Sequence, residues 1–177
     1  MIAATSHANQ FDPIPFPSGS ASGGPTWQQL LADAISDPAE LCTVLGLDPA
    51  LIVPAIQAAK GFALRVPRSY VARMRHGDPT DPLLLQVLPL GAELEETRGF
   101  VSDPVGDMER RAAPGLLHKY HGRALMIATG ACAVHCRYCF RRHFPYGEES
   151  ALQQGWQPAL DHLRADTTIS EVILSGG

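Results

Sequence analysis

The sequence has 177 residues, of which 45% are hydrophobic and 18% charged, and its formal net charge is -4. This length allows one domain of about 150 residues, or a small domain with part of another. Its 16 glycines and 15 prolines are too few for a low-complexity, wholly disordered chain. The negative charge argues against a general nucleic-acid binder. With no apolar run near the ~20 residues that span a bilayer and no secretory signal at the start, we expect a soluble, cytoplasmic protein without a membrane partner.

The first half of the chain predicts a poorly ordered arm followed by several short helices. Residues 1–25 are rich in Pro, Ser, Gly and Ala, which is typical of a disordered arm. Helices are expected from Trp27 to Ile35, over residues 38–45, 49–60 and 67–75, and from Pro82 to Leu88. Their boundaries are marked by Thr26, Asp37, Asp48 and Asp81 as N-caps and by Gly46, Gly61 and Gly77 as stops. We therefore predict a small helical domain over residues 26–90, with a structural or docking use.

The hydrophobic pattern changes in the second half. Glycines and prolines punctuate residues 91–115, which predicts an irregular linker. Apolar runs at 124–128 and 171–174 predict two strands buried on both faces, with a loop and a helix near residues 156–164 between them. This succession is a βαβ unit, whose strands lie parallel. Because parallel sheets bind ligands at the carboxyl ends of their strands, the loop after the first strand and the glycines after the second are candidate site segments.

That loop carries three of the four cysteines. Cys132, Cys136 and Cys139 form a C-x3-C-x2-C pattern, which lets one turning loop direct three sulfurs at one centre. Three thiolates leave one position of a tetrahedral metal, or one iron of a [4Fe-4S] cluster, without a protein ligand. An iron-sulfur site, a structural zinc site with His135 or His143 as fourth ligand, and inert thiols all remain open at this point. Disulfides are poor candidates in a cytosolic chain.

The charge around the cysteines is one-sided. No Asp or Glu lies between Glu109 and Glu148. The same window is either an anion-binding segment or a solvated basic loop, and its coincidence with the cysteines favours anion binding. Its basic side chains include Lys119, Arg123, Arg137, Arg141 and Arg142.

Several of these segments resemble a known family. The cysteine pattern, with Tyr138 just before the last cysteine and a strand before the loop, resembles the signature of radical S-adenosylmethionine (SAM) enzymes. Ser175-Gly176-Gly177 resembles the glycine-rich segment with which that family binds the methionine amino group, where a bare backbone allows close approach. Residues 62–70, 114–123 and 136–146 are similar to lysine 2,3-aminomutases, and 139–146 are similar to the branch that makes (R)-β-lysine for elongation factor P. The resemblance covers most of residues 27–177.

The resemblance implies a fold, a reaction and a set of cofactors. The fold would be α/β, a small N-terminal helical domain followed by the first βα units of a partial (β/α)6 radical-SAM barrel, starting at residue 116 and truncated at residue 177. The reaction would be an isomerisation of (S)-α-lysine to (R)-β-lysine with a [4Fe-4S] cluster, SAM and pyridoxal 5'-phosphate (PLP) as cofactors. Implied partners are lysine, an electron-donor protein, the elongation factor P lysine ligase and, in a homo-oligomer, further copies of the chain. A catabolic lysine or glutamate 2,3-aminomutase and a zinc-stabilised binding module are the alternatives.

The resemblance also assigns roles to individual residues. Cys132, Cys136 and Cys139 would bind the cluster, and Arg141 would pair with the substrate carboxylate, which suits a planar guanidinium. The residues implied near cofactors are Tyr138, Ser175, Gly176 and Gly177 for SAM, and Lys119 and Tyr120 for PLP. No catalytic residue is expected in this chain, because the family's Schiff-base lysine lies in the later half of the barrel. We therefore expect these 177 residues alone not to turn over lysine.

Overall fold

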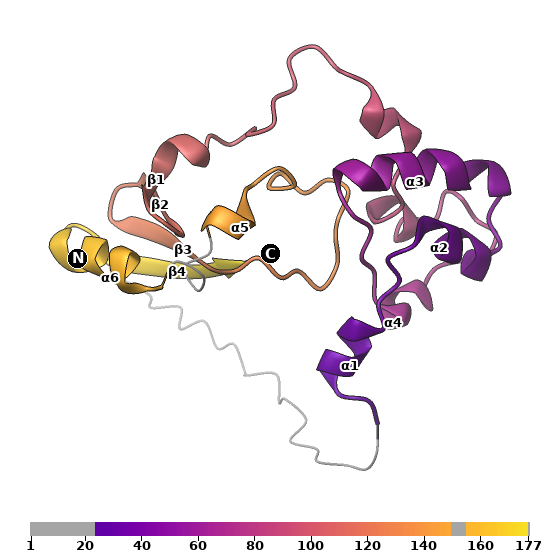
Figure 1. Cartoon of the computed structure of the whole chain (residues 1–177), viewed down its shortest axis with the longest axis horizontal. Helices are drawn as coiled ribbons and strands as arrows, with labels where there is room; N and C mark the ends of the chain where they lie inside the picture. Colours follow the sequence, from indigo (N-terminus) through magenta and orange to yellow (C-terminus); the bar gives the residue numbers. More distant parts are fainter. Residues whose placement is uncertain (1–23, 150–154, 177) are drawn as a thin grey trace, which may run out of the picture.

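The computed structural model describes residues 24–149 and 155–176 and has mixed α/β architecture. Short helices gather on one side and a four-stranded sheet lies on the other (Figure 1). The segment that follows strand β3 (Arg123–Thr129) runs from the sheet to the helical side and returns to α5 (Tyr146–Glu149) (Figure 1). Within the described residues, no helix has the length and apolar character needed to cross a membrane. The predicted arm at residues 1–25 lies almost wholly outside the described residues.

The helices of the first half are α1 (Trp27–Ala32), α2 (Pro38–Leu45), α3 (Ile52–Gly61) and α4 (Arg68–Val71), with 3-10 turns η1 (Pro49–Leu51) and η2 (Leu84–Gln86). Side-chain caps start α1, α2 and η1, whereas α3 and α4 begin without one. As predicted, Thr26 forms a capping box with Gln29, and the Asp37 carboxylate accepts a hydrogen bond from the Ala39 amide at 2.9 Å. The 3-10 turns η3 (Gly91–Leu94) and η4 (Met108–Arg110) follow.

Three of the expected helices are shorter than predicted. The helix from Trp27 stops at Ala32, because the backbone of Ile35 exchanges two hydrogen bonds with Val66 in a β-bridge. The helix expected over residues 67–75 ends at Val71. Over residues 82–88 only η2 forms. The buried Asp81 carboxylate accepts the amides of Leu83 and Leu84 as the predicted N-cap, and it also accepts the amide of Arg75.

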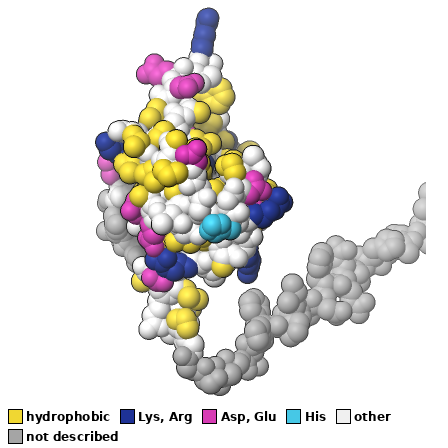
Figure 2. All heavy atoms as spheres, turned by 90° about the vertical axis from the view of Figure 1, so that its right-hand side faces the viewer, with side chains coloured by type: hydrophobic (Ala, Val, Ile, Leu, Met, Phe, Trp, Pro, Cys, Tyr) yellow, Lys and Arg dark blue, Asp and Glu magenta, His cyan; other side chains and the backbone are white. Residues whose placement is uncertain are grey.

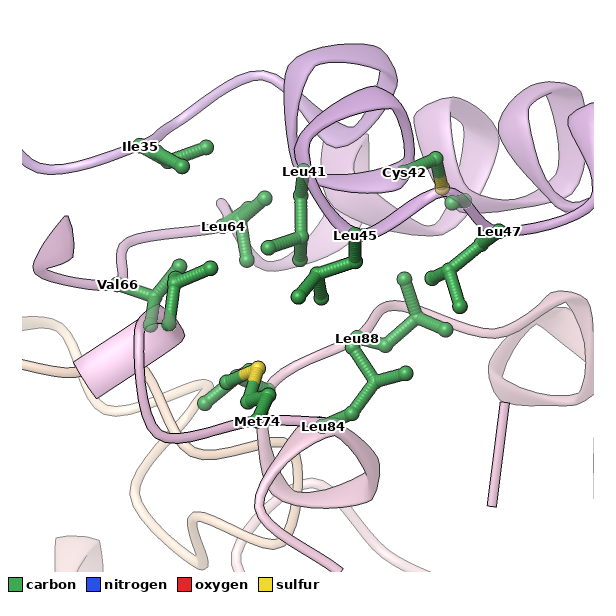
Figure 3. Packing of buried hydrophobic residues seen from close by; sticks show 13 residues of the cluster. Ile35, Leu41, Cys42, Leu45, Leu47, Leu64, Val66, Met74, Leu84 and Leu88 are labelled. Atoms are coloured by element: carbon green, nitrogen blue, oxygen red, sulfur yellow. The ribbon is translucent and has the colours of Figure 1, made fainter. Parts of the chain in front are cut away.

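Apolar side chains from the helices and the segments between them form one core. Figure 3 shows Leu41, Leu45, Leu64 and Leu88 among the side chains that converge there. Cys42 is buried in the same cluster, and burial, with a smaller contribution from Asp37, raises the pKa of its thiol. Cys42 is therefore a small core residue. Figure 2 views the molecule from the helical side, where hydrophobic side chains lie among charges of both signs.

Gly46 ends α2 in a conformation that alanine tolerates poorly. Its φ is 61°, and a Cβ there would lie 2.2 Å from the His76 ring. We expect Gly46→Ala to lower the free energy of unfolding by about 1–3 kcal/mol, from the left-handed backbone and the displaced ring. Gly61→Ala is the matched control, because an added Cβ there meets no atom within 4 Å and should be neutral or slightly stabilising. Urea denaturation would measure both, and equal effects would contradict this explanation.

The sheet contains the predicted parallel pair and a hairpin that was not predicted. Its strands are β1 (Arg111–Ala113), β2 (Leu116–Tyr120), β3 (Arg123–Thr129) and β4 (Glu171–Gly176), in the order β1-β2-β3-β4. β3 and β4 pair in parallel, with α6 (Gln157–Ala165) between them in sequence, as the βαβ pattern indicated. β1 and β2 pair antiparallel, and so do β2 and β3. The prediction of an irregular segment up to residue 115 was therefore wrong at β1, which is held by backbone pairing instead of by an apolar run.

The two faces of the sheet have different neighbours. Side chains alternate between faces, and Leu116, Ala124 and Met126 pack with Ala159 of α6 on one of them. Leu125 and Ile173, paired across β3 and β4, face the other side and line a cavity. The prediction that β4 is buried on both faces was wrong: Leu174 is 70% exposed, because within the described residues β4 has a strand neighbour on one side only.

Candidate functional site

The cysteine loop between β3 and α5 (Tyr146–Glu149) is anchored to the helical half through its backbone. The His135 amide donates to the Arg65 carbonyl at 2.9 Å, and the Arg137 amide donates to the Gln86 carbonyl at 2.8 Å. Val134, just before His135, packs against the helical core. These contacts fix the stretch that joins the first two cysteines, so the helical half acts as a template for the loop.

A half-buried carboxylate, that of Glu93, draws two arginines of the loop together. Glu93 binds Arg137 through two hydrogen bonds of 2.9 and 2.6 Å and accepts a third from Arg142 at 2.8 Å. Both guanidinium groups also lie over the Phe62 ring, with centroid distances of 5.0 and 5.2 Å. Burial opposes the charge of Glu93, but the hydrogen bonds from Arg137, the Leu90 amide and Arg142 lower its pKa below the ordinary value.

All three loop cysteines line one cavity of about 320 Å³. The loop therefore directs the three predicted ligands towards one space. The other residues that line it include Phe62, Gly130, His135, Tyr138, Arg141 and Tyr146.

Tyr146 brings an unpartnered hydroxyl to this cavity. Its Oη is buried and donates to no acceptor among the described residues, and its ring packs so close to Gly130 that a Cβ there would lie 2.8 Å away. Burial raises the pKa of this phenol, Arg141 opposes the rise, and the thiols of Cys139 and Cys132 add to it. The group stays protonated at neutral pH and can donate to a sulfur atom in the cavity. An orphaned donor beside two candidate ligands fits an anionic iron-sulfur cluster.

A closed zinc site fits the same residues less well. With Zn–S near 2.3 Å, a tetrahedral zinc would hold its sulfurs about 3.8 Å apart. A group of His, Cys, Asp or Glu side chains that could hold a metal ion has at least three ligand atoms, all within 4.8 Å of one another. Across residues 24–149 and 155–176, the three cysteines do not form such a group. His135 Nδ1 is 2.9 Å from the Ala63 carbonyl and its ring stacks on Phe62, and His143 does not line the cavity. Neither histidine is therefore placed as a fourth ligand.

Arg141 lies between the cysteine cavity and a second cavity of about 260 Å³ and lines both. Its Nε donates to Asp107 at 2.8 Å and its Nη1 to the Ser175 hydroxyl at 3.4 Å, while its guanidinium stacks 5.0 Å from the Phe140 centroid. Asp107 is buried, so it holds the guanidinium in one orientation. The Nη2 of Arg141 donates no hydrogen bond to an acceptor among the described residues, which leaves one edge of the guanidinium for an anion.

The second cavity brings together the two residues expected near PLP. Lys119 and Tyr120 of β2 line it together with Arg141 and Ile173. The Lys119 ammonium donates to the Val105 carbonyl and lies 5.9 Å from the Tyr120 ring centroid. Among the described residues Lys119 forms no close ion pair, whereas Arg123 pairs with Glu171. Asp103 lies near enough for the Lys119 charge to contribute to the lowered pKa of that carboxyl. This cavity therefore offers an anion a cation that no carboxylate contacts directly.

Of the residues expected beside SAM, Tyr138 lines the cysteine cavity, whereas Gly176 packs against β3. Tyr138 lines the cysteine cavity and is 70% exposed, with its hydroxyl 3.3 Å from the Gln86 side chain. Cys136 is the main cause of the raised pKa of Tyr138. At Gly176 a Cβ would lie 2.9 Å from the Thr129 carbonyl oxygen, so pairing with β3 already requires a glycine there. Gly177 lies outside the described residues.

Comparison with known proteins assigns the chain to a family, although no family model matches it. It is 49% identical over 152 residues to the L-lysine 2,3-aminomutase of Escherichia coli (strain K12), which covers 85% of this chain and 44% of that protein. The chain belongs to the lysine 2,3-aminomutase family. L-lysine 2,3-aminomutases of Haemophilus influenzae and Clostridium subterminale are 46% and 30% identical, over 85% and 68% of the chain. The chain spans just under half the length of the E. coli and H. influenzae family members.

The sequence did not predict the roles of two acidic residues that orient the arginines of the site. Glu93 and Asp107 come from the segment expected to be an irregular linker, and they neutralise Arg137, Arg142 and Arg141. The prediction that the basic window binds anions from solution was therefore wrong for Arg137, which is 7% exposed and fully paired. No local pattern marks either acid, because its partners lie 34 to 49 residues away.

Proposed function

We propose that the protein is a radical SAM lysine 2,3-aminomutase that supplies (R)-β-lysine for elongation factor P, and that this chain contributes its cluster site. One observation carries the proposal: Cys132, Cys136, Cys139 and Arg141 line a single cavity. In the proposal the three thiolates bind three irons of a [4Fe-4S] cluster, and the fourth iron is open to SAM. When bound, the cluster and SAM supply a hydrogen-abstracting radical and PLP supports the migration of the amino group.

The chain's own residues have distinct parts in this proposal. Tyr146 would donate its hydroxyl proton to the cluster, and Tyr138, Ser175 and Gly176 would hold SAM, a role proposed for Gly177 as well. Arg141, oriented by Asp107, pairs with the lysine carboxylate. Lys119 faces the PLP phosphate with Tyr120 beside it. Supporting this division, Arg141 separates a cavity that holds the cysteines from one that holds Lys119.

Metal analysis tests the cluster site. After anaerobic reconstitution with iron and sulfide, the chain should show charge-transfer absorption and, when reduced, the electron paramagnetic resonance signal of a [4Fe-4S] cluster that SAM perturbs. Native protein that contains zinc without iron or sulfide would contradict the proposal and favour a zinc-stabilised binding module.

The reaction is tested by assaying a protein that contains this chain and is as long as its relatives. Conversion of lysine but not glutamate to a β-amino acid, followed by transfer of the β-lysine to elongation factor P by its lysine ligase, is expected. Turnover of glutamate, or β-lysine that never reaches elongation factor P, would favour a catabolic aminomutase. An electron donor must be supplied in either case.

Arg141→Lys is expected to spare the cluster and weaken lysine binding by about 10- to 100-fold, equivalent to about 1.4–2.8 kcal/mol. The charge is retained, but the planar fork that Asp107 orients is lost. Cluster content is measured by iron and sulfide analysis, and lysine binding by the KM of the protein at the full length of its relatives. Arg164→Lys on exposed α6 is the control. Unchanged KM in Arg141→Lys would refute the carboxylate role.

A further inference from the structure

A histidine-rich cluster lies at the opposite edge of the sheet from the cysteine loop. His162 lies in the last turn of α6, Asp166 is the C-cap of that helix, and His118 lies on β2. β4 begins at Glu171, which pairs with Arg123 at the start of β3, whereas the cysteine loop follows the other end of β3. None of the three residues lines either cavity described above, so the cluster is a separate feature and does not depend on the proposed function.

The three side chains bring their ligand atoms together. One ring nitrogen of each histidine and one oxygen of Asp166 all lie within 4.8 Å of one another, the only such set among the described residues. His118 Nδ1 is 3.6 Å from Asp166 Oδ2, which is too long for a direct hydrogen bond. His162 Nε2 is buried and has no hydrogen-bond partner. A buried orphan nitrogen facing a histidine and a carboxylate calls for a bound group.

The local fold orients the carboxylate before any ligand arrives. Asp166 Oδ1 accepts hydrogen bonds from the Thr168 amide at 3.0 Å and the Thr168 hydroxyl at 2.6 Å, which leaves Oδ2 for His118. These bonds, chiefly the one from the hydroxyl, lower the pKa of Asp166, so the group is ionised at neutral pH. The Asp166 amide donates to the His162 carbonyl at 3.0 Å and caps α6, which holds both residues at one helix end.

We propose that His118, His162 and Asp166 bind a zinc ion that joins the end of α6 to β2. Two imidazoles and one carboxylate are the donor set of a three-ligand zinc site, with water in the fourth position, and imidazole donors disfavour magnesium and calcium. With Zn–N and Zn–O distances of about 2.0–2.2 Å, tetrahedral ligands lie about 3.4 Å apart, so the side chains need to close by little more than an ångström. His118 and Asp166 are 20% and 29% exposed, which gives the ion a path from solvent.

Zinc binding to the full chain tests this site. Cys132, Cys136 and Cys139 are first replaced by alanine so that thiolates do not compete, and zinc is titrated calorimetrically. One zinc per chain at micromolar concentration and a raised melting temperature are expected. Asp166→Asn, whose amide oxygen can still accept from Thr168, should weaken binding at least tenfold. Asp161→Asn on the same helix, 62% exposed, should bind as before.

A measurement on the chain with native histidines keeps the test independent of variant stability. Zinc should shift the ring-nitrogen resonances of His118 and His162 and leave those of His135 and His143 in place. Absence of zinc binding at micromolar concentration, undiminished binding in Asp166→Asn, or shifts confined to other histidines would each overturn the proposal.

Discussion

Replacing Cys136 with alanine is expected to abolish iron-sulfur binding. The proposed cluster has three protein ligands in this chain. The variant would keep two, so two of the four irons would have no protein ligand. After anaerobic reconstitution, iron and sulfide should fall at least tenfold, with loss of the charge-transfer absorption. Cys132→Ala and Cys139→Ala should behave alike, because all three side chains line the same cavity.

Cys42→Ala is the matched control for this loss. Its thiol is buried in the core of the helical half, far from the loop in sequence, and burial raises its pKa. It should keep full iron content at a modest cost in stability. Circular dichroism would verify that each variant is folded. A folded Cys136→Ala chain that retained its iron, or a folded Cys42→Ala chain that lost it, would refute the assignment.

Glu93→Gln is expected to produce the largest loss of stability among the single changes considered. The glutamine is nearly isosteric but leaves Arg137 and Arg142 without their shared anion, and Arg137 is 7% exposed. Removing one partner of such a pair should lower the free energy of unfolding by about 2–4 kcal/mol. Because these arginines lie in the cysteine loop, its proteolysis and the loss of a reconstituted cluster in air should also become faster.

The effect of Glu93→Gln should depend on pH in a defined direction. The pKa of Glu93 is lowered in the folded protein, so its charge stabilises the fold above the ordinary carboxyl value of about 4.3. That stabilisation is lost as the pH falls through the lower, folded value. Urea denaturation should therefore show a wide gap between wild type and variant at pH 7 that closes below about pH 4. Asp33→Asn is the control, because its exposed pair with Arg68 is worth less than about 1 kcal/mol.

Much of the fold was predictable because short-range chemistry specifies it. Asp37-Pro38 and Gly46 enclose α2 as predicted, since a side-chain cap and a left-handed glycine act within a few residues. The apolar runs of β3 and β4 and the intervening α6 predicted a parallel pair, which the sheet confirms. The cysteine spacing likewise indicated that one loop could present three sulfurs to one space, and the three line one cavity.

Long-range contacts decided what those signals could not specify. Ile35 leaves the helix that its own segment predicts and pairs with the distant Val66. β1 has no apolar run and exists because β2 pairs with it. For Ile35 a tertiary partner, and for β1 the neighbouring strand of a hairpin, overrides the local preference, which amounts to less than about 1 kcal/mol per residue.

For this protein the sequence by itself determined the capped helices, the parallel strand pair, the cysteine loop and the family to which the chain belongs. Only the tertiary structure decided which groups surround those cysteines. Glu93 and Asp107 orient the loop arginines, Tyr146 turns an unpartnered hydroxyl to the cavity, and His118 meets the end of α6. The physical reason is distance along the chain: a cap acts over three residues, whereas an ion pair depends on where the fold brings two distant side chains.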